Sequence, residues 1–504
     1  MPYNNERSTA SGGFDVLNDP AVRAFLDSVE VVRDHSDRIG YIRQQLLNVS
    51  HLVHELATGT ILASDASPYE SVARKDIPSV RLGVVKFSNV VIFVDQYLRL
   101  RDRNEVFVDP VDIARLKKES NHSKVILPGA GITRRDQPKS KSFFRATVFN
   151  DIFNSPDFAC LGVSLYDTFC ELLRKSGRPD AENTPPRPGR EGEKVVGSVI
   201  VKDGAEWIEF ARKSPIDGTP LKNRLLVPLN PGYLDIDGDP AQRVYVTDAL
   251  RIQEVFSEQG SNMECFNRLM SVLEHLLIIH IIRASHLSDP SIVANMNVIV
   301  DGPLAIFGEA ARFHRSIMAI LSEIRADCQS RRMRGPVVMG VSKTGKVVEH
   351  AHLIENILMR DEADEPLEGT FILPVSDEYR GMFISPDEID TTKNFGDETY
   401  YGQTFLVRTS RKKVFDVTLA YPFSRKTPVN GVPFRDAKVD LANYGDDISH
   451  MVSVIEMMQT DLYQNALIPV HLAHRYASIA HSPGGRSLDR FVREVLSIRR
   501  EVGR

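Results

Sequence analysis

The stretch MNVIVDGPL, residues 296–304, carries the clearest strand signal in this 504-residue chain. Its apolar residues lead directly into an Asp-Gly pair, Asp301 and Gly302, which is typical of a turn. The pattern predicts a buried strand that ends at Asp301. A carboxylate at the end of a buried strand is costly unless a positive group neutralises it, and a divalent cation is the strongest such partner. Asp301 is therefore the first candidate metal ligand.

A second apolar run, in GTILASDASPYES at residues 59–71, predicts a short buried strand from Thr60 to Ala63 that ends at Asp65. Between the two runs, the spacing of apolar residues over 262–284 predicts a long buried helix that includes Glu274. A buried carboxylate on such a helix needs a positive partner. Two strand-end aspartates with a facing glutamate form an all-oxygen site suited to Mg²⁺ or Mn²⁺. Such a site can activate water and stabilise the departing oxygen of a phosphodiester.

The rest of the chain mixes helix and strand patterns and indicates an α/β fold. VRLGVVKF and NVVIFVDQYLRL, within residues 80–100, predict a hairpin with its turn at Ser88–Asn89. VVGSVIV and AEWIEF predict another, with Asp203 and Gly204 in the turn. Helical spacing recurs at 19–57, 310–330, 447–463, 468–480 and 488–500, and further strand patterns occur at 224–228, 243–246, 336–345, 400–410 and 413–422.

The composition is that of an ordinary globular protein, with 42% hydrophobic and 26% charged residues. The formal charge of -5 argues against a protein that coats nucleic acid through an overall positive field. The four cysteines, Cys160, Cys170, Cys265 and Cys328, lie too far apart for a zinc motif or a disulfide framework. The polar N-terminus lacks a signal-peptide core, and the longest apolar run, Leu276–Ile282, is short for a membrane span. We expect a soluble, cytoplasmic protein with no membrane contact.

The length exceeds that of one compact core, so we expect one large elaborated domain or two. Residues 176–194 are rich in Pro, Gly and charge and predict a flexible loop. We assign residues 1–106 to N-terminal helices and the first core strands, 107–245 to a large insertion containing this loop, and 246–504 to the rest of the core with its C-terminal helices.

Five motifs resemble those of the NurA nuclease family, and they occur in the family's order. They are ASDAS at Ala63–Ser67, VLE at Val272–Glu274, DGPL at Asp301–Leu304, GVSKT at Gly340–Thr344 and IPVHLAHR at Ile468–Arg475. The first has Asp-Ala-Ser where the family has Asp-Gly-Ser, and the third has Asp-Gly-Pro-Leu for Asp-Gly-Ser-Leu. In the last, the leucine and the Ala-His pair are closer together than in the family pattern. Both substitutions beside the aspartates keep the carboxylates.

This resemblance implies a ribonuclease H-like mixed sheet flanked by helices, with a helical N-terminal segment and the large insertion. It implies a DNA nuclease that depends on Mn²⁺ or Mg²⁺, with Asp65, Glu274 and Asp301 as metal ligands. Such nucleases act as homodimers that cap a ring-shaped HerA-like hexameric DNA-translocating ATPase and process DNA ends, so we expect a role in DNA repair or in defence against phage.

Two further residues complete the predicted catalytic set. Lys343 follows an apolar strand, and a compact cation there can contact the scissile phosphate. His474 lies near His471 in a helix that Pro469 opens, and a histidine there can bind metal or move a proton. Tyr401 is a weaker candidate for substrate contact, and the alternative that we favour for it is a packing role. GVSKTGK lacks the hydroxyl residue that a phosphate-binding loop requires, because Val347 follows it, so we do not expect ATPase activity.

Several alternatives remain open. Asp95 or Asp203 can replace Asp65, and Glu254 or Glu264 can replace Glu274. An ion pair to Arg268 or Arg283 would also satisfy Glu274. The basic residues near the C-terminus can form a DNA or partner surface or simply a solvated helix face. The alternative function is a catalytically inactive NurA-like adaptor that docks on a translocase.

Overall fold

The computed structural model describes residues 19–29, 39–54, 56, 59–73, 77, 79–101, 121–177, 192–359, 367–386, 394–460 and 467–479. The chain divides into two units, Met1–Leu46 and Leu47–Arg504. The first contains helices α2 (Pro20–Ser28) and α3 (Ile39–Gln45). Most of the predicted flexible loop and all of the basic segment 488–500 lie outside the described residues.

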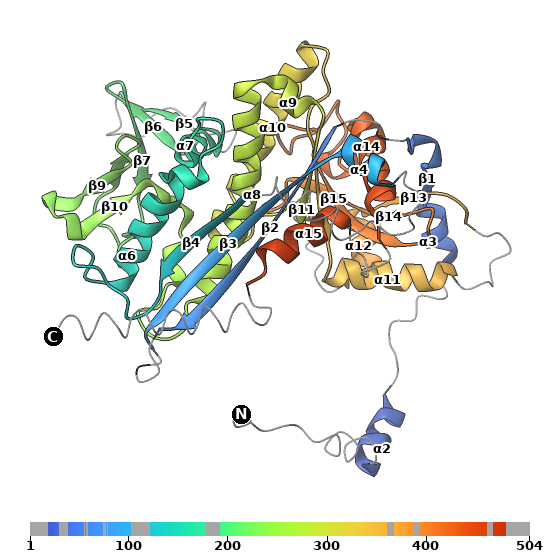
Figure 1. Cartoon of the computed structure of the whole chain (residues 1–504), viewed down its shortest axis with the longest axis horizontal. Coiled ribbons are helices and arrows are strands. Elements are labelled where there is room, and N and C mark those ends of the chain that lie inside the picture. Colours follow the sequence, from blue (N-terminus) through green and yellow to red (C-terminus); the bar gives the residue numbers. More distant parts are fainter. Residues whose placement is uncertain are drawn as a thin grey trace. The chain divides into compact units, whose positions relative to one another are not determined.

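The second unit is built on a nine-stranded mixed sheet (Figure 1). In order across the sheet, its strands are β1 (Leu47–Asn48), β13 (Phe371–Pro374), β14 (Gly402–Arg408), β15 (Val414–Ala420), β12 (Val337–Ser342), β11 (Met296–Asp301), β2 (Thr60–Val72), β3 (Arg81–Phe93) and β4 (Asn121–Pro128). Strands β2, β11 and β12 are parallel, and every other neighbouring pair is antiparallel. Three antiparallel strands followed by two parallel ones form a ribonuclease H-like core, so the predicted fold class is confirmed.

Helices cover both faces of this sheet because its strands are apolar on both sides. In β11, Val298 and Val300 belong to one buried cluster and Ile299 to the other. Helices α8 (Met263–Ser288), α10 (Phe313–Ser330) and α7 (Leu165–Lys175) contribute to the first cluster. Helices α14 (Asp446–Met458) and α15 (Ile468–Ala477) contribute to the second. Both α8 and α15 contact β2 and β3, so these strands lie between two helices (Figure 1).

The segment between β4 and α8 forms smaller elements. Helix α6 (Ser140–Thr147) and a π-helical turn (Val148–Phe153) precede α7. Two small antiparallel sheets follow, β5-β6-β7-β8 (Lys194–Val196, Val199–Lys202, Ala205–Phe210, Leu225–Pro228) and β9–β10 (Tyr233–Asp235, Arg243–Tyr245). The predicted turn at Asp203 and Gly204 is confirmed, since it joins β6 to β7 with positive φ at both residues. A buried ion pair between Arg145 and Asp248 ties α6 to the chain after β10.

Two strand predictions were wrong. Asp65 does not end its strand: β2 continues to Val72, because it pairs with β3 in an unbroken ladder of thirteen registered positions. Ser88 and Asn89 form no turn but lie within β3, opposite Asp65 and Ser64. In both places, long-range strand pairing overrides the weak local preferences of small polar residues.

The remaining α-helices among the described residues are α4 (Val94–Arg101), α9 (Pro290–Ala294), α11 (Lys346–Met359), α12 (Asp377–Phe383) and α13 (Phe434–Ala437). By length and composition, α8 alone among the described helices is apolar enough to cross a membrane, but 67% of its apolar window is buried within the protein. All four cysteines are free thiols, as expected.

Candidate metal centre

Asp65 lies in the middle of β2 and is almost completely buried. Its Oδ1 accepts a hydrogen bond from the Ala66 N–H at 2.8 Å, and its Oδ2 lies 2.7 Å from His474 Nδ1. Burial raises the pKa of Asp65, and the negative charge of Asp301 raises it further, whereas His474 and Lys343 oppose the rise. Asp65 therefore carries negative charge that the surrounding protein compensates only in part.

Asp301 is the last residue of β11, on the strand next to β2. The pairing of Val300 with Ser64 places Asp301 and Asp65 at neighbouring positions of two parallel strands. Lys343 Nζ donates to Asp301 Oδ2 at 2.7 Å. Lys343 directly follows β12, so the ends of two parallel strands bring this pair together.

The turn after Asp301 requires glycine at two positions. Gly302 has a φ of 99°, and its N–H donates to the Val341 carbonyl at 2.9 Å. A Cβ atom added to Gly340 would lie 2.3 Å from the Gly302 carbonyl oxygen. The turn therefore packs directly on β12, which fixes the direction in which the chain leaves Asp301.

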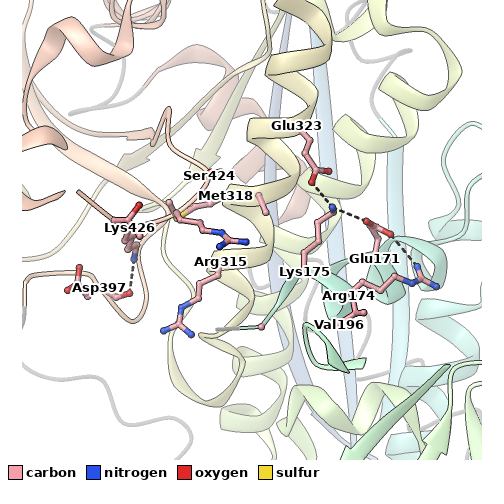
Figure 2. Close-up of a pocket in the computed structure, with 14 residues that line it drawn as sticks. Glu171, Arg174, Lys175, Val196, Arg315, Met318, Glu323, Asp397, Ser424 and Lys426 are labelled. Atoms are coloured by element: carbon pink, nitrogen blue, oxygen red, sulfur yellow. Dashed lines mark hydrogen bonds and ion pairs between the residues drawn. The ribbon is translucent and has the colours of Figure 1, made fainter. Parts of the chain in front are cut away.

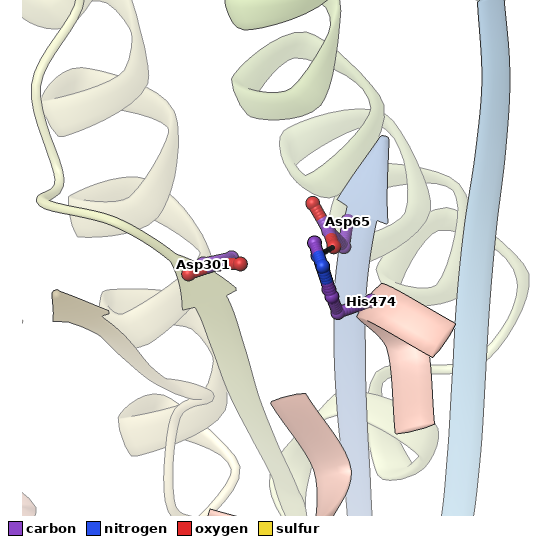
Figure 3. A group of neighbouring side chains, drawn as sticks. All are labelled: Asp65, Asp301 and His474. Carbon is purple, nitrogen blue, oxygen red and sulfur yellow. Dashed lines mark hydrogen bonds and ion pairs between the residues drawn. The ribbon is translucent and has the colours of Figure 1, made fainter. Parts of the chain in front are cut away.

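His474 reaches the same point from α15. Single ligand atoms of Asp65, Asp301 and His474 all lie within 4.8 Å of one another (Figure 3). Oxygen and nitrogen ligands bind a divalent cation at about 2 to 2.6 Å, so ligands of one ion lie about 3 to 5 Å apart. The spacing of these ligand atoms is therefore within the range of a single-cation site.

Glu274 approaches from the opposite face of the sheet, on α8. Its Oε1 accepts a hydrogen bond of 2.9 Å from Ala66 N–H, which also lies against Asp65. Burial raises the pKa of Glu274 well above its usual value, and the charges of Asp65 and Asp301 act in the same direction. The interactions described for Glu274 include no ion pair with Arg268 or Arg283, so neither arginine compensates its charge when it ionises.

The alternative acidic residues lie in other surroundings. Glu254 is paired with Arg251 at 2.6 Å, and the 75% exposed side chain of Glu264 lies 3.3 Å from Arg268. Asp95 lies on α4, 3.7 Å from Arg99. Asp203 lies in the β6–β7 turn. The structure thus brings Asp65, Glu274, Asp301, Lys343 and His474 together and places the four alternatives elsewhere.

A buried histidine–tyrosine pair lies near Glu274, and no sequence pattern indicates that its two members meet. The Tyr401 hydroxyl lies 2.7 Å from Nδ1 of His275, the residue that follows Glu274 on α8. Burial lowers the pKa of His275 to about 4 and raises that of Tyr401, so both are neutral at pH 7. Tyr401 is therefore a packing residue that supports α8 rather than a surface for substrate.

Sequence reasoning missed the buried carboxylate of Asp416. It lies on β15, opposite Ser342 of β12. Burial raises the pKa of Asp416 to about 6, against the opposing effects of a hydrogen bond from Ser342 and the charge of Arg380. Its Oδ1 is buried and has no hydrogen-bond partner among the described residues. In FDVTL, apolar and polar residues alternate, and this pattern normally indicates that the polar residues face solvent. The sequence therefore did not predict a buried carboxylate here.

We expect Asp416→Asn to stabilise the metal-free protein above pH 6, by about 1 to 3 kcal/mol. The pKa of Asp416 is higher in the folded state than in the unfolded chain, so the wild type loses stability as pH rises from about 4 to about 6. Asparagine removes that loss. Urea unfolding at a series of pH values, in EDTA, measures the difference. A variant less stable than wild type at pH 8 would show that Arg380 already compensates the charge.

Comparisons with known proteins give no sequence match and two weak structural likenesses. No protein-family model and no curated protein sequence matches the chain. The crystal structure of the NurA nuclease from Sulfolobus solfataricus is similar at a TM-score of 0.34 and 8% identity, over 98% of this chain and 99% of that one. A second crystal structure, of NurA, has a TM-score of 0.25 at 8% identity, over 92% of this chain and 95% of that one. Both likenesses are weak.

Proposed function

We propose that this protein is a nuclease that hydrolyses DNA with the help of a divalent cation, Mn²⁺ or Mg²⁺. One observation carries the proposal. Two carboxylates and a histidine from three elements meet on a ribonuclease H-like sheet, a third carboxylate on α8 shares the Ala66 N–H with Asp65, and a lysine contacts Asp301. The raised pKa values of Asp65 and Glu274 indicate surplus negative charge, which a divalent cation neutralises.

Each residue has a role in hydrolysis under this proposal. Asp65, Glu274 and Asp301 would hold the cation, which would supply the charge that activates water and stabilises the departing oxygen. Lys343, whose side chain is partly exposed, contacts a phosphate oxygen. His474 is half exposed and held through Nδ1 by Asp65, so its other ring nitrogen takes the proton of the attacking water. The new P–O bond forms as the old one breaks, and the departing oxygen is protonated from solvent.

The ordered motifs support a wider proposal. A homodimer of this cytoplasmic protein would act on DNA fed by a HerA-like hexameric translocase, in repair or in defence against phage. The chain lacks a complete phosphate-binding loop, because Val347 follows GVSKTGK, so a partner must supply the energy for translocation. Ala66 and Pro303 replace the family's glycine and serine beside the two aspartates, and these substitutions favour the inactive adaptor as the second candidate.

Digestion of linear and plasmid DNA by the wild-type protein separates the two candidates. We expect cleavage with Mn²⁺, with or without a HerA-like translocase, and none with EDTA. Cleavage that persists in EDTA would contradict a metal-dependent reaction. Absence of cleavage under all conditions, together with stable binding to the translocase, would leave only the adaptor.

Lys343→Met is expected to lower cleavage by about 10²-fold without weakening metal binding. The ammonium group that contacts Asp301 is lost, so the local potential becomes more negative and Mn²⁺ binds as tightly as before or more tightly. Cleavage rates and Mn²⁺ titrations measure both effects. Lys346→Met, which changes an exposed lysine three residues later, is the matched control. Equal losses in the two variants would contradict a catalytic role for Lys343.

A further inference from the structure

A pocket of about 640 Å³ lies apart from the metal centre, and none of the five residues proposed for catalysis lines it. Helix α7 contributes Glu171, Arg174 and Lys175 to one wall (Figure 2). Lys426 and Asp397 lie on the opposite side of the pocket. Residues of α10 lie between these two sides (Figure 2). The α10 residues include Arg315, Met318 and Glu323.

The acidic residues on the α7 side are already paired. Glu323 accepts from Lys175 at 2.6 Å, and Glu171 lies 3.2 Å from Arg174 and 3.4 Å from Lys175. Across the pocket, Lys426 Nζ donates to two backbone carbonyls, those of Gly396 at 2.6 Å and Asp397 at 2.8 Å. These carbonyls satisfy hydrogen bonds but carry no full negative charge.

Cations and one carboxylate surround Lys426. Burial lowers the pKa of Lys426 to about 7; among the neighbouring charges, Asp397 has the largest effect and opposes this fall, whereas Lys438 and Arg315 add to it. The same cations act on His314, whose pKa falls to about 3 through burial, Lys426 and Arg315. Like charges held together in a partly buried site are unfavourable, and a bound anion relieves the repulsion.

We propose that this pocket binds the phosphate group of a nucleotide, with Arg315 and Lys426 contacting its oxygens. The volume far exceeds the needs of inorganic phosphate and falls in the range of small-molecule sites, about 300 to 1,000 Å³. Met318 and Ala319 of α10 and Val196 of β5 are apolar lining residues against which a base or sugar packs. The ligand is either a free nucleotide or the terminal phosphate of a DNA strand, since both offer the same group.

Calorimetric titration of the full-length protein in EDTA tests this without relying on cleavage. We expect dAMP to bind saturably at one site, deoxyadenosine not to bind, and Arg315→Ala and Lys426→Met each to weaken dAMP binding by at least about tenfold. Arg331→Ala, at the end of α10 and outside the pocket, is the control. Thermal melting checks that the variants fold. If Lys426→Met does not fold, Arg315→Ala alone tests the proposal.

Competition identifies the source of the phosphate. Stronger displacement of dAMP by a 5′-phosphorylated oligonucleotide than by its 5′-hydroxyl counterpart assigns the pocket to a strand end, and displacement by neither assigns it to free nucleotides. Absence of saturable dAMP binding, or unchanged affinity in both variants, would overturn the proposal. Equal affinity for inorganic phosphate and dAMP would overturn the assignment to a nucleotide. These outcomes do not depend on whether the protein cleaves DNA.

Discussion

Asp301→Asn is expected to lower Mn²⁺-dependent DNA cleavage by about 10³-fold or more, while the protein stays folded. A difference of this size corresponds to about 4 kcal/mol of lost transition-state stabilisation. Asn keeps the shape of the side chain at the end of β11 but removes one negative charge from the group that faces Asp65 and His474. The neutral amide is also a poor partner for Lys343 Nζ, which now donates to the carboxylate.

The matched control is Asp203→Asn. Asp203 is also followed by glycine in a turn after a strand, but it lies in the small β5–β8 sheet. Its φ of 50° suits asparagine as well as aspartate, so the turn should survive. Initial rates of plasmid digestion and Mn²⁺ binding are measured for both variants. Full activity of Asp301→Asn, or equal losses in the two, would remove Asp301 from the proposed reaction.

The site could be predicted from the sequence where the local pattern and the tertiary environment agree. The β11 strand is apolar before Asp301 except at Asn297, it is flanked by two parallel strands and it ends in an Asp-Gly turn, so the local signals agree with the observed structure. The same holds for α8, whose predicted range 262–284 differs from Met263–Ser288 by only a few residues at its ends. Local signals therefore placed Asp301 and Glu274 on the correct elements.

The predictions that failed share a cause, because each depends on contacts or burial that the local sequence does not determine. In β2, the residues directly after Ala63, from Ser64 to Ser67, are small, and their pairing with β3 keeps them extended. Asp65 therefore lies within a strand and not at its end, where it was predicted. The contact of His474 with Asp65 joins residues 409 positions apart, and no local pattern encodes it. Asp416 was missed because the alternating pattern of β15 is buried on both faces.

Glu274→Gln is expected to change activity and stability in opposite directions. Cleavage should fall by about 10³-fold, because one of the three carboxylates that neutralise the cation is lost. The metal-free protein should become more stable at pH 8, since burial and the charges of Asp65 and Asp301 all disfavour ionised Glu274 in the folded state. The amide oxygen can still accept the Ala66 N–H, so the local structure is retained.

The metal separates this effect from a simple change in packing. Mn²⁺ at about 100 times its dissociation constant should stabilise the wild type by about 2.7 kcal/mol, and this gain should shrink in Glu274→Gln. The control is Glu264→Gln, which changes an exposed glutamate of α8 that is paired with Arg268. It should leave activity, metal-free stability and the Mn²⁺ response unchanged. Melting curves with EDTA and with Mn²⁺, beside cleavage rates, test all three. If Glu274→Gln loses stability without metal, the glutamate is compensated within the protein itself, and the surplus negative charge on which the proposed cation depends is absent.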